Sequence, residues 1–264
     1  MASLKLPKYL TLPDGKQPIT GCTKGDVAEY VILTNYREQV EAAAKMLRPV
    51  NVQVRGDEAA MTVTGKYGGF EVTIANGGVG VGQNSNIIEE LINIGGRVFI
   101  QLGATGALQE DVRLGDVIIP VASVRDEGLS DYYAPKQYPA VSDYRIVFAL
   151  RRAAEELGYR VHTGIIRTTE GFYPSQRIAE YVELYSRLGV LGVEQETSGI
   201  FTLCSTRGCY AGASLMVIGN LVTGLHYWQG DSQDFLRERW FSQIKVILMA
   251  ISILRAEGFP GQTR

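Results

Sequence analysis

Short apolar runs alternate with amphipathic stretches along most of the chain, a pattern typical of strands that alternate with helices. Runs rich in Val, Ile and Leu predict buried strands, and apolar residues spaced three and four positions apart predict helices. We predict strands at residues 29–33, 50–54, 60–64, 70–75, 98–100, 117–120, 159–169 and 210–219. We predict helices at residues 36–46, 84–94, 144–157 and 200–204, and from 232 or 233 to about 256. The pattern indicates an α/β fold.

The stretch from Arg97 to Pro120 is the most informative part of this pattern. The apolar run at residues 98–100 ends in Q-L-G-A-T-G at residues 101–106. In an open α/β sheet ligands bind just past the carboxyl ends of strands. Small residues at such a place let a ligand approach the backbone closely. We therefore expect residues 101–106 to form a loop at a ligand site.

Composition narrows the class of protein. With 264 residues, 45% of them hydrophobic and 20% charged, the chain is long enough for one large domain with a sizeable core. We expect residues 1–27 to form an irregular arm, because they contain several Pro and Gly, and residues 28–264 to form the domain. A net charge of −2 without a basic block argues against nucleic-acid binding.

Neither a membrane location nor a metal centre is expected. No apolar run approaches the roughly 20 residues of a membrane span, and the first residues lack the apolar core of a signal peptide. The three cysteines, Cys22, Cys204 and Cys209, include no C-x-x-C pair, and the chain has two histidines. A disulfide framework or a zinc site is therefore not expected, and the cytoplasm is the expected location.

A glycine-rich segment, Asn76-Gly77-Gly78-Val79-Gly80-Val81-Gly82, lies between a predicted strand and a predicted helix. Glycines at a helix N-terminus expose backbone N–H groups and the positive end of the helix dipole, which attract anions. The spacing G-x-G-x-G does not match the dinucleotide-binding fingerprint. Tight packing of strand against helix is the other explanation for these glycines, and both can hold together.

Several motifs, taken together, resemble the nucleoside phosphorylase family, which includes uridine phosphorylase, purine nucleoside phosphorylase and methylthioadenosine nucleosidase. The resemblance is closest to the uridine phosphorylase type, and it extends from about Tyr30 to Ala256 with the order of motifs kept. The motifs that carry it are G-A-T-G-A-L at 103–108, L-G-D-V-I-I-P at 114–120, P-A-V-S-D at 139–143, F-Y-P-S-Q at 172–176 and V-E-Q-E at 193–196.

The resemblance implies a fold and an activity. The fold would be a single α/β domain with a mixed, twisted and partly barrel-like sheet flanked by helices. The reaction would be phosphorolysis of a nucleoside, without an organic cofactor or a metal. Family members are usually hexamers built from dimers, so a homo-oligomer whose sites are completed by a neighbouring chain is expected. The implied partners are a nucleoside and phosphate.

The resemblance also implies roles for individual residues. Glu196 would accept hydrogen bonds from both ribose hydroxyls, with Glu194 and Gln195 beside it, and Glu196 and Gln101 would be the catalytic pair. A fixed carboxylate suits this task because cleavage of the glycosidic bond develops positive charge on the sugar. The base would stack on Phe172 and pair with Gln176, whose amide can donate to a carbonyl and accept from a ring N–H. Arg177, Thr105 and Gly106 would complete the base site.

The nucleophile side departs from the family pattern. Glutamines stand where the family has phosphate-binding arginines, at Gln39 and Gln101, and Ala104 replaces a phosphate-binding threonine. Phosphate would then depend on Arg37 or Arg55 together with Gly78, Thr105 and Gln101. The alternative for Arg37 is an ordinary solvated helix residue. On the base side Ile178 and Leu221 replace arginines, and Asn220 cannot donate the proton that purine-specific relatives supply at this place.

Three functions fit these residues. The first is phosphorolysis of a pyrimidine nucleoside similar to uridine, giving free base and pentose 1-phosphate. The second is hydrolysis of an N-glycosidic bond, since water needs no cationic cradle. The third is a catalytically inactive nucleoside-binding or storage protein, which would keep the sugar carboxylate and the stacking ring but not the phosphate arginines.

Overall fold

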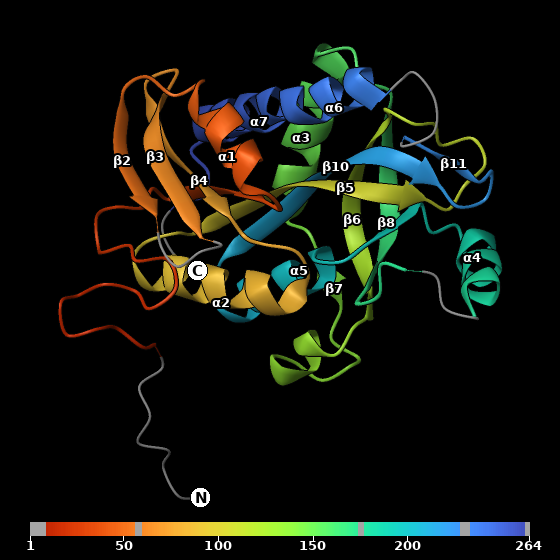
Figure 1. Ribbon diagram of the computed structural model, residues 1–264, viewed down its shortest axis with the longest axis horizontal. Helices are drawn as coiled ribbons and strands as arrows, with labels where there is room; N and C mark the ends of the chain where they lie inside the picture. Colours follow the sequence, from red (N-terminus) through yellow and green to blue (C-terminus); the bar gives the residue numbers. More distant parts are fainter. Residues whose placement is uncertain (1–8, 56–59, 174–176, 228–232, 262–264) are drawn as a thin grey trace, which may run out of the picture.

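The computed structural model describes residues 9–55, 60–173, 177–227 and 233–261. Its strands are β1 (Tyr30–Thr34), β2 (Val50–Arg55), β3 (Met61–Tyr67), β4 (Phe70–Asn76), β5 (Val98–Ala107), β6 (Val117–Asp126), β7 (Ala140–Val141), β8 (Val161–Thr169), β9 (Gly192–Glu194), β10 (Tyr210–Asn220) and β11 (Leu225–His226). Its α-helices are α1 (Arg37–Ala44), α2 (Val81–Asn93), α3 (Tyr144–Glu156), α4 (Ile178–Arg187), α5 (Thr197–Thr206), α6 (Gln233–Ser242) and α7 (Ile244–Ala256). Figure 1 shows these elements arranged around a strongly twisted sheet.

Part of the sheet closes on itself. Strand β5 pairs in parallel with β10, β10 pairs with β6, β6 with β8, and β8 with β9, which returns to β5 in antiparallel orientation. On its other side β5 pairs with β1, and the sheet continues through β4 and β3 to β2. The mixed and partly barrel-like sheet that the resemblance implied is therefore confirmed.

The segment at residues 101–106 is a strand rather than the loop we expected. Strand β5 extends to Ala107, and its second half pairs with β10, so that Gly103 lies opposite Leu215. A Cβ atom at Gly103 would lie 2.8 Å from the side chain of Leu215, and one at Gly106 would lie 2.5 Å from that of Leu221. The glycines thus permit close packing inside the barrel, and small residues alone did not distinguish this from a ligand loop.

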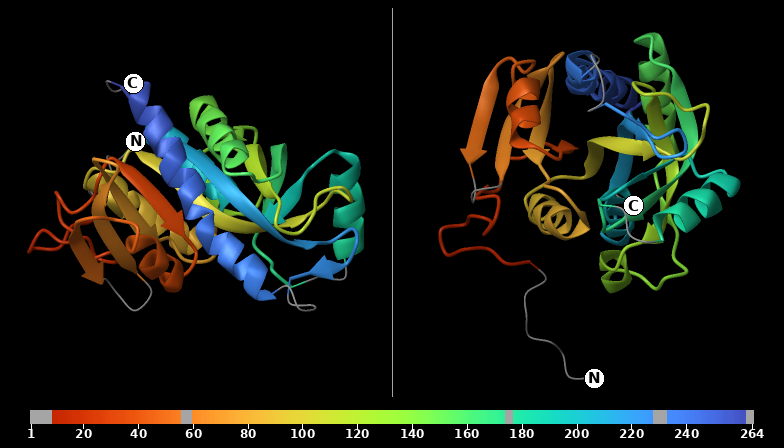
Figure 2. Two further views of the ribbon diagram at one scale, coloured as in Figure 1. Left: turned by 90° about the horizontal axis from the view of Figure 1, so that it is seen from above. Right: turned by 45° about the vertical axis from the view of Figure 1, so that its right-hand side comes forward.

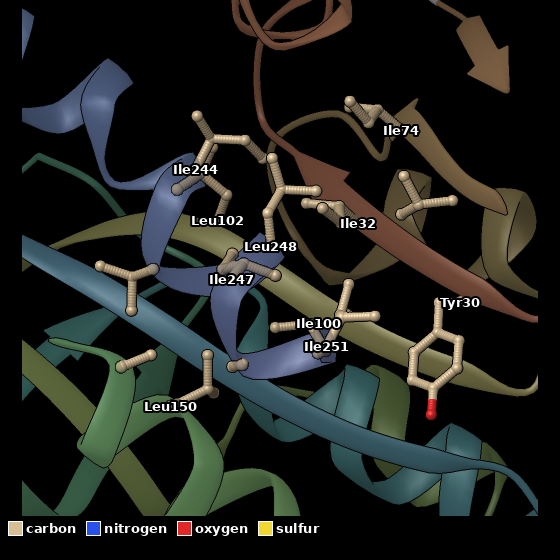
Figure 3. Close-up of a cluster of buried hydrophobic side chains, with 14 of the residues drawn as sticks. Tyr30, Ile32, Ile74, Ile100, Leu102, Leu150, Ile244, Ile247, Leu248 and Ile251 are labelled. Carbon is tan, nitrogen blue, oxygen red and sulfur yellow. The ribbon is translucent and has the colours of Figure 1, made fainter. Parts of the chain in front are cut away.

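Two apolar layers hold the helices on the sheet. On one face, side chains of the central strands meet helices α3 and α7, as Figure 3 shows for Ile32, Ile74, Ile100, Leu102, Leu150, Ile244, Ile247, Leu248 and Ile251. On the other face α2 and α5 cover the sheet. The final helix predicted as continuous is divided at Gln243, whose buried Nε2 donates to Ser214 Oγ over 2.6 Å.

The N-terminal arm and helix α4 stand apart from these layers. The arm is fastened to α2 by Glu90, whose carboxylate accepts the backbone N–H groups of Ile19 and Thr20 at 2.8 and 2.7 Å. Helix α4 has no buried side chain and lies at the edge of the molecule in every view (Figures 1 and 2). The domain boundary at residues 27 and 28 stays a prediction. Across the residues described, no helix combines the length and apolar character needed to cross a membrane.

Candidate functional site

The main cavity lies where β1, β5, β9 and β10 end, with α4 at its side. Its volume is about 970 Å³. Residues predicted to bind the nucleoside that line it are Thr105, Gly106, Phe172, Glu194, Gln195 and Glu196. Because these residues come from three separate stretches of the chain, the fold brings together the predicted sugar and base residues in one space.

Glu196 is the buried acceptor at the centre of this site. It is 4% exposed and precedes α5. Its Oε1 accepts the backbone N–H of Gly80 at 2.7 Å, and its Oε2 accepts Gln101 Nε2 at 3.1 Å. Both carboxylate oxygens are therefore held in place from opposite sides, while the side chain still lines the main cavity.

Gln101 supports Glu196 from behind and does not itself line the main cavity. Its Oε1 accepts the hydroxyl of Thr197 at 2.8 Å. The Glu196 carboxylate orients this amide, because a carboxylate only accepts hydrogen bonds and so faces the amide nitrogen, which leaves the amide oxygen toward Thr197. In the described structure Gln101 thus positions the carboxylate rather than facing a nucleophile.

Glu194 hydrogen-bonds to the backbone at the start of α5, whereas Glu196 lines the main cavity. Its Oε2 accepts the backbone N–H groups of Glu196 and Thr197 at 2.7 and 2.9 Å, which caps the start of α5. Its Oε1 accepts the hydroxyl of Thr168, and Thr168 Oγ1 in turn accepts the N–H of Ser198 at 2.9 Å. Glu194 therefore fixes the turn from which Glu196 projects.

The pKa values of both buried carboxyl groups are raised. Burial raises the pKa of Glu196 to about 8, and the nearby charge of Glu194 adds to the effect. Burial also raises the pKa of Glu194, but hydrogen bonds from Thr168 and from two backbone N–H groups oppose this shift. The proton therefore resides on Glu196, the carboxyl with fewer donors around it.

The residues predicted to hold phosphate are engaged elsewhere in the structure. Gly78 N donates to Asn76 Oδ1 at 2.9 Å, and Thr105 Oγ1 donates to Val193 O at 2.9 Å. Arg37 forms an exposed ion pair with Glu41 on the outer face of α1, with 3.4 Å between its Nε and Oε1. The side chain of Arg55 lies outside the described residues. No anion cradle thus forms among those that the structure describes.

The side chain of Gln39 hydrogen-bonds to the backbone N–H groups at the start of α1. Its Oε1 accepts the N–H groups of Asn35 and Tyr36, both at 3.2 Å. The N-cap residue of α1 is Tyr36. The Nε2 of Gln39 is buried and has no hydrogen-bond partner within the described part of the chain. The amide oxygen occupies backbone donors that could otherwise bind an anion.

The side chains predicted to bind the base are more exposed than those predicted to bind the sugar. The ring of Phe172 is half exposed and lies edge-on to Tyr173, with 5.4 Å between their centroids. Gln176 lies outside the described residues. Arg177 does not line the main cavity, and its 66% exposed side chain pairs with Glu180 at 3.0 Å. Phe172 is therefore the predicted base residue that the structure places against the main cavity together with Thr105 and Gly106.

The residues that line the main cavity without having been assigned to it from the sequence include Asn35, Tyr36, His226 and Trp240. Trp240 Nε1 donates to Gly103 O at 3.1 Å, and its ring meets Tyr36 edge-on at 6.0 Å. Burial lowers the pKa of His226. Tertiary contacts between α1, α6 and β11 bring these residues together, so no local pattern in the sequence indicated them.

The described residues include no group of three or more His, Cys, Asp or Glu side chains suited to a metal ion. The one Arg or Lys among the described residues that line the main cavity is Arg187, 72% exposed and 3.6 Å from Glu183. The polar groups that line the cavity are therefore mainly carboxyl, amide and hydroxyl groups, with the His226 imidazole and the exposed Arg187 beside them.

Comparison with known proteins identifies clear similarities. A family model described as the phosphorylase superfamily matches residues 29–255. A uridine phosphorylase of Thermococcus kodakarensis is 35% identical over 234 residues, which cover 84% of this chain and 84% of that protein. A guanosine phosphorylase of Halorubrum lacusprofundi is 33% identical and covers 85% and 91%. A uridine phosphorylase of Escherichia coli is 33% identical and covers 76% and 84%.

Proposed function

The chain belongs to the phosphorylase superfamily, and on this premise we propose that it cleaves the N-glycosidic bond of a uridine-like pyrimidine nucleoside with phosphate. The products would be the free base and a pentose 1-phosphate. The family membership confirms the resemblance inferred from the motifs, and relatives named uridine phosphorylase support the reaction type.

The observation that carries the proposal is the arrangement around Glu196. A carboxylate held by Gly80 N and Gln101 Nε2 faces the main cavity and can accept the hydroxyls of a pentose. As the bond to the base breaks, positive charge develops on the sugar. A fixed anion nearby then stabilises the transition state more than the ground state. Glu196 in its ionised form provides this anion.

The choice of a pyrimidine base rests on Asn220. Its Nδ2 donates to the carbonyl groups of Gln109 and Val112 at 2.9 and 2.8 Å, and its Oδ1 accepts two backbone N–H groups of the following turn. An amide engaged in this way offers no proton to a purine ring. The relative named guanosine phosphorylase makes guanosine the first competitor to test.

We propose that the active form is a homo-oligomer in which a neighbouring copy supplies the cation for phosphate. Support comes from an exposed apolar face built from adjacent elements. Val141 and Ile165 flank Ala122 on the paired strands β7, β6 and β8, and α3, one turn of which carries Tyr144 and Phe148, packs against the same strands. These four side chains are all exposed, at 44–75%, which is typical of an interaction surface.

Hydrolysis is the second candidate, and a specific observation favours it. Gly78 N, Thr105 Oγ1, Gln101 Nε2 and the N–H groups at the start of α1 already have partners inside the chain. A charge-assisted hydrogen bond contributes roughly 1.5–3 kcal/mol, so a site without cations binds phosphate weakly. Water as the nucleophile needs no such set of cationic side chains.

One assay separates the candidates. The protein is incubated with uridine, cytidine, inosine or guanosine, with and without phosphate, and free base is measured. Release of uracil that requires phosphate, with pentose 1-phosphate as the second product, is expected. Release that is independent of phosphate identifies a hydrolase. Binding of uridine by calorimetry without any release indicates a binding or storage protein, the third function that fits the sequence.

A further inference from the structure

Asn35 lies in the turn between β1 and α1, and we propose that it is a positioning residue of the candidate site. Its side-chain amide holds the carboxylate of Glu196 at the wall of the main cavity, whereas Gln101 holds the same group from behind. Asn35 and Glu196 both line the main cavity, and Gln101 does not. The inference deepens the proposed function, on which its consequences for turnover rest.

The end of β1 places Asn35 beside the glycine-rich segment at residues 76–82. Strand β1 pairs in parallel with β4, which runs into this segment. Asn35 Nδ2 donates to Gly78 O over 3.4 Å, and in the same segment Gly80 N donates to Glu196 Oε1 at 2.7 Å. The parallel pairing therefore brings the Asn35 amide and the Glu196 carboxylate to one short stretch of backbone.

Buried side chains fix both ends of the contact between Asn35 and Gly78. Gln39, which is 2% exposed, accepts the backbone N–H of Asn35 with its Oε1 at 3.2 Å. Asn84, which is 3% exposed, donates its Nδ2 to Gly78 O at 3.0 Å. The place of the Asn35 side chain thus follows from the fold on either side of it.

The Asn35 amide faces Glu196 with its nitrogen. Burial raises the pKa of Glu196 to about 8, and a hydrogen bond from Asn35 opposes this rise because it stabilises the ionised form. The carboxylate of Glu196 and the carbonyl of Gly78 only accept hydrogen bonds, and the amide nitrogen has two hydrogens to donate. The reverse orientation would set the amide oxygen against two other oxygens. Asn35 is therefore a donor toward Glu196.

No buried cation in the described cavity wall takes over this task. The charge of Glu194 raises the pKa of Glu196. Burial raises the pKa of Tyr36, and the charge of Glu196 adds to that effect, so the phenol stays neutral at neutral pH. The other titratable residues of the described wall are Tyr173, Glu183, Arg187 and His226. The first is exposed, the next two form an exposed ion pair, and burial lowers the pKa of the imidazole.

The proposed reaction needs Glu196 in its ionised form. Because the pKa of Glu196 is about 8, loss of a donor lowers the ionised fraction at neutral and acidic pH. Well above this pH the carboxyl group is ionised with or without that donor. A positioning role of Asn35 therefore predicts a loss of activity that shrinks as pH rises, whereas a merely structural role predicts the same loss at every pH.

The first test measures kcat/KM for uridine, in the presence of phosphate, at pH 6.5 and at pH 9 for the wild type and Asn35→Ala. The pH dependence of kcat/KM reports the ionisation of groups in the free enzyme. We expect the variant to lose about tenfold at pH 6.5 and less than about threefold at pH 9. No loss, or an equal loss at both pH values, would overturn the assignment.

Asn35→Asp sharpens the test because it keeps the shape of the side chain and replaces a donor by a negative charge. Carbon-13 NMR of the glutamate carboxyl groups follows the titration of Glu196 directly, and Glu196→Gln assigns the signal. The midpoint of the titration should rise in Asn35→Ala and rise further in Asn35→Asp. Equal midpoints in the wild type and both variants would contradict the role of Asn35.

Asn84→Ala is the matched control. It removes a donor to the same Gly78 carbonyl, but the donors to Glu196 stay in place. The titration midpoint of Glu196 should stay at the wild-type value. A rise as large as that in Asn35→Ala would mean that the glycine-rich segment, and not the Asn35 amide, governs Glu196.

The role of Asn35 and the proposed function can fail separately. If no nucleoside releases its base, the activity is wrong, yet the NMR titration still decides whether Asn35 stabilises the Glu196 carboxylate. If Asn84→Ala does not fold, the order of the midpoints in the wild type, Asn35→Ala and Asn35→Asp decides alone.

Discussion

The two ends of the main cavity are built in opposite ways. At the end that we propose binds the sugar (the sugar end), formed by Gly80, Gln101, Thr168 and residues 194–197, buried side chains and backbone N–H groups make a continuous set of hydrogen bonds. At the end that we propose binds the base (the base end), formed by Phe172 and Leu221 with Ile178 and Val182 of α4, the side chains are apolar or half exposed, and α4 buries none of its own residues.

This difference matches the chemistry that each end must perform. Charge develops on the sugar during cleavage, and a preorganised, water-excluded group stabilises that charge most effectively. The base leaves the site after cleavage, so its pocket needs shape more than charge. A rigid sugar end and an adaptable base end would let one reaction act on several bases. The following changes test this division, from the largest expected effect to the smallest.

Glu196→Gln should cause the largest loss of activity. The variant cannot become an anion, so it loses the stabilisation of charge on the sugar, and kcat/KM should fall at least 100-fold. Gln101 can turn its amide to suit the new side chain, because the Thr197 hydroxyl accepts as well as donates. An unchanged far-ultraviolet circular dichroism spectrum serves as the control for folding, and wild-type turnover would remove Glu196 from its assigned role.

Thr168→Val should weaken the sugar end without touching the ligand. Thr168 Oγ1 contacts Glu194 Oε1, the N–H of Ser198 and Ser123 Oγ, and valine has the same shape without the hydroxyl. Loss of these contacts leaves a buried carboxylate and a buried N–H short of partners, which costs roughly 1–3 kcal/mol of unfolding free energy.

The same variant should also lower kcat about tenfold and leave KM nearly unchanged, because the misplaced group is Glu196 and not the base pocket. Urea titration and steady-state kinetics measure the two effects. If stability falls while kcat and its pH profile stay at the wild-type values, Thr168 has only a structural role.

The raised pKa of Glu196 predicts how the free energy of unfolding depends on pH. The pKa of Glu196 is about 8 in the folded protein, against an ordinary value of 4.5. Between these values the folded state keeps a proton that the unfolded state releases, so the free energy of unfolding should fall as pH rises from about 5 to 8. With these two values the fall should be on the order of 3–4 kcal/mol. Glu196→Gln should show a flatter profile over this range, and identical profiles would contradict the raised pKa.

Arg37→Ala should have the smallest effect. The ion pair between Arg37 and Glu41 is exposed, and such pairs contribute about 0–1 kcal/mol. We expect the KM for phosphate to change less than twofold, with Glu41→Gln as the matched control. A tenfold rise in the KM for phosphate in Arg37→Ala alone would mean that the arginine enters the site and that the nucleophile end resembles the sugar end in its use of charge.

The sequence predicted the residues that line the main cavity better at 194–196 and Phe172 than around Arg37 and Gln39, for a physical reason. Glu194–Glu196 and Phe172 lie in compact motifs, so their proximity to the ligand site followed from the motifs themselves. Arg37 and Gln39 are two positions apart on a helix, about 200° around its axis, so they face opposite sides. Only the packed structure shows that Gln39 is buried and that Arg37 faces outward. Gly80 was missed as a donor because the direction of a backbone N–H is not visible in a sequence.

At the base end, too, the sequence could identify single residues but not how the elements pack. Ile178 and Leu221 could be identified as apolar replacements, but whether α4 lines the main cavity depends on where the whole helix lies beside the sheet. The amphipathic pattern of residues 178–187 does not indicate whether the apolar face meets core side chains or a cavity. The closed circuit of five strands likewise arises from pairing between β9 and β5, which are distant in the chain.

A double-mutant cycle between protein and ligand tests the role of Glu196 most directly. Affinities of uridine and 2′,3′-dideoxyuridine are measured by calorimetry for the wild type and for Glu196→Gln. Two charge-assisted hydrogen bonds are worth roughly 3–6 kcal/mol together, so the wild type should bind the dideoxy compound at least 100-fold more weakly. The variant should show less than a fivefold difference between the two ligands. An equal difference in both proteins would mean that the ribose hydroxyls do not meet Glu196.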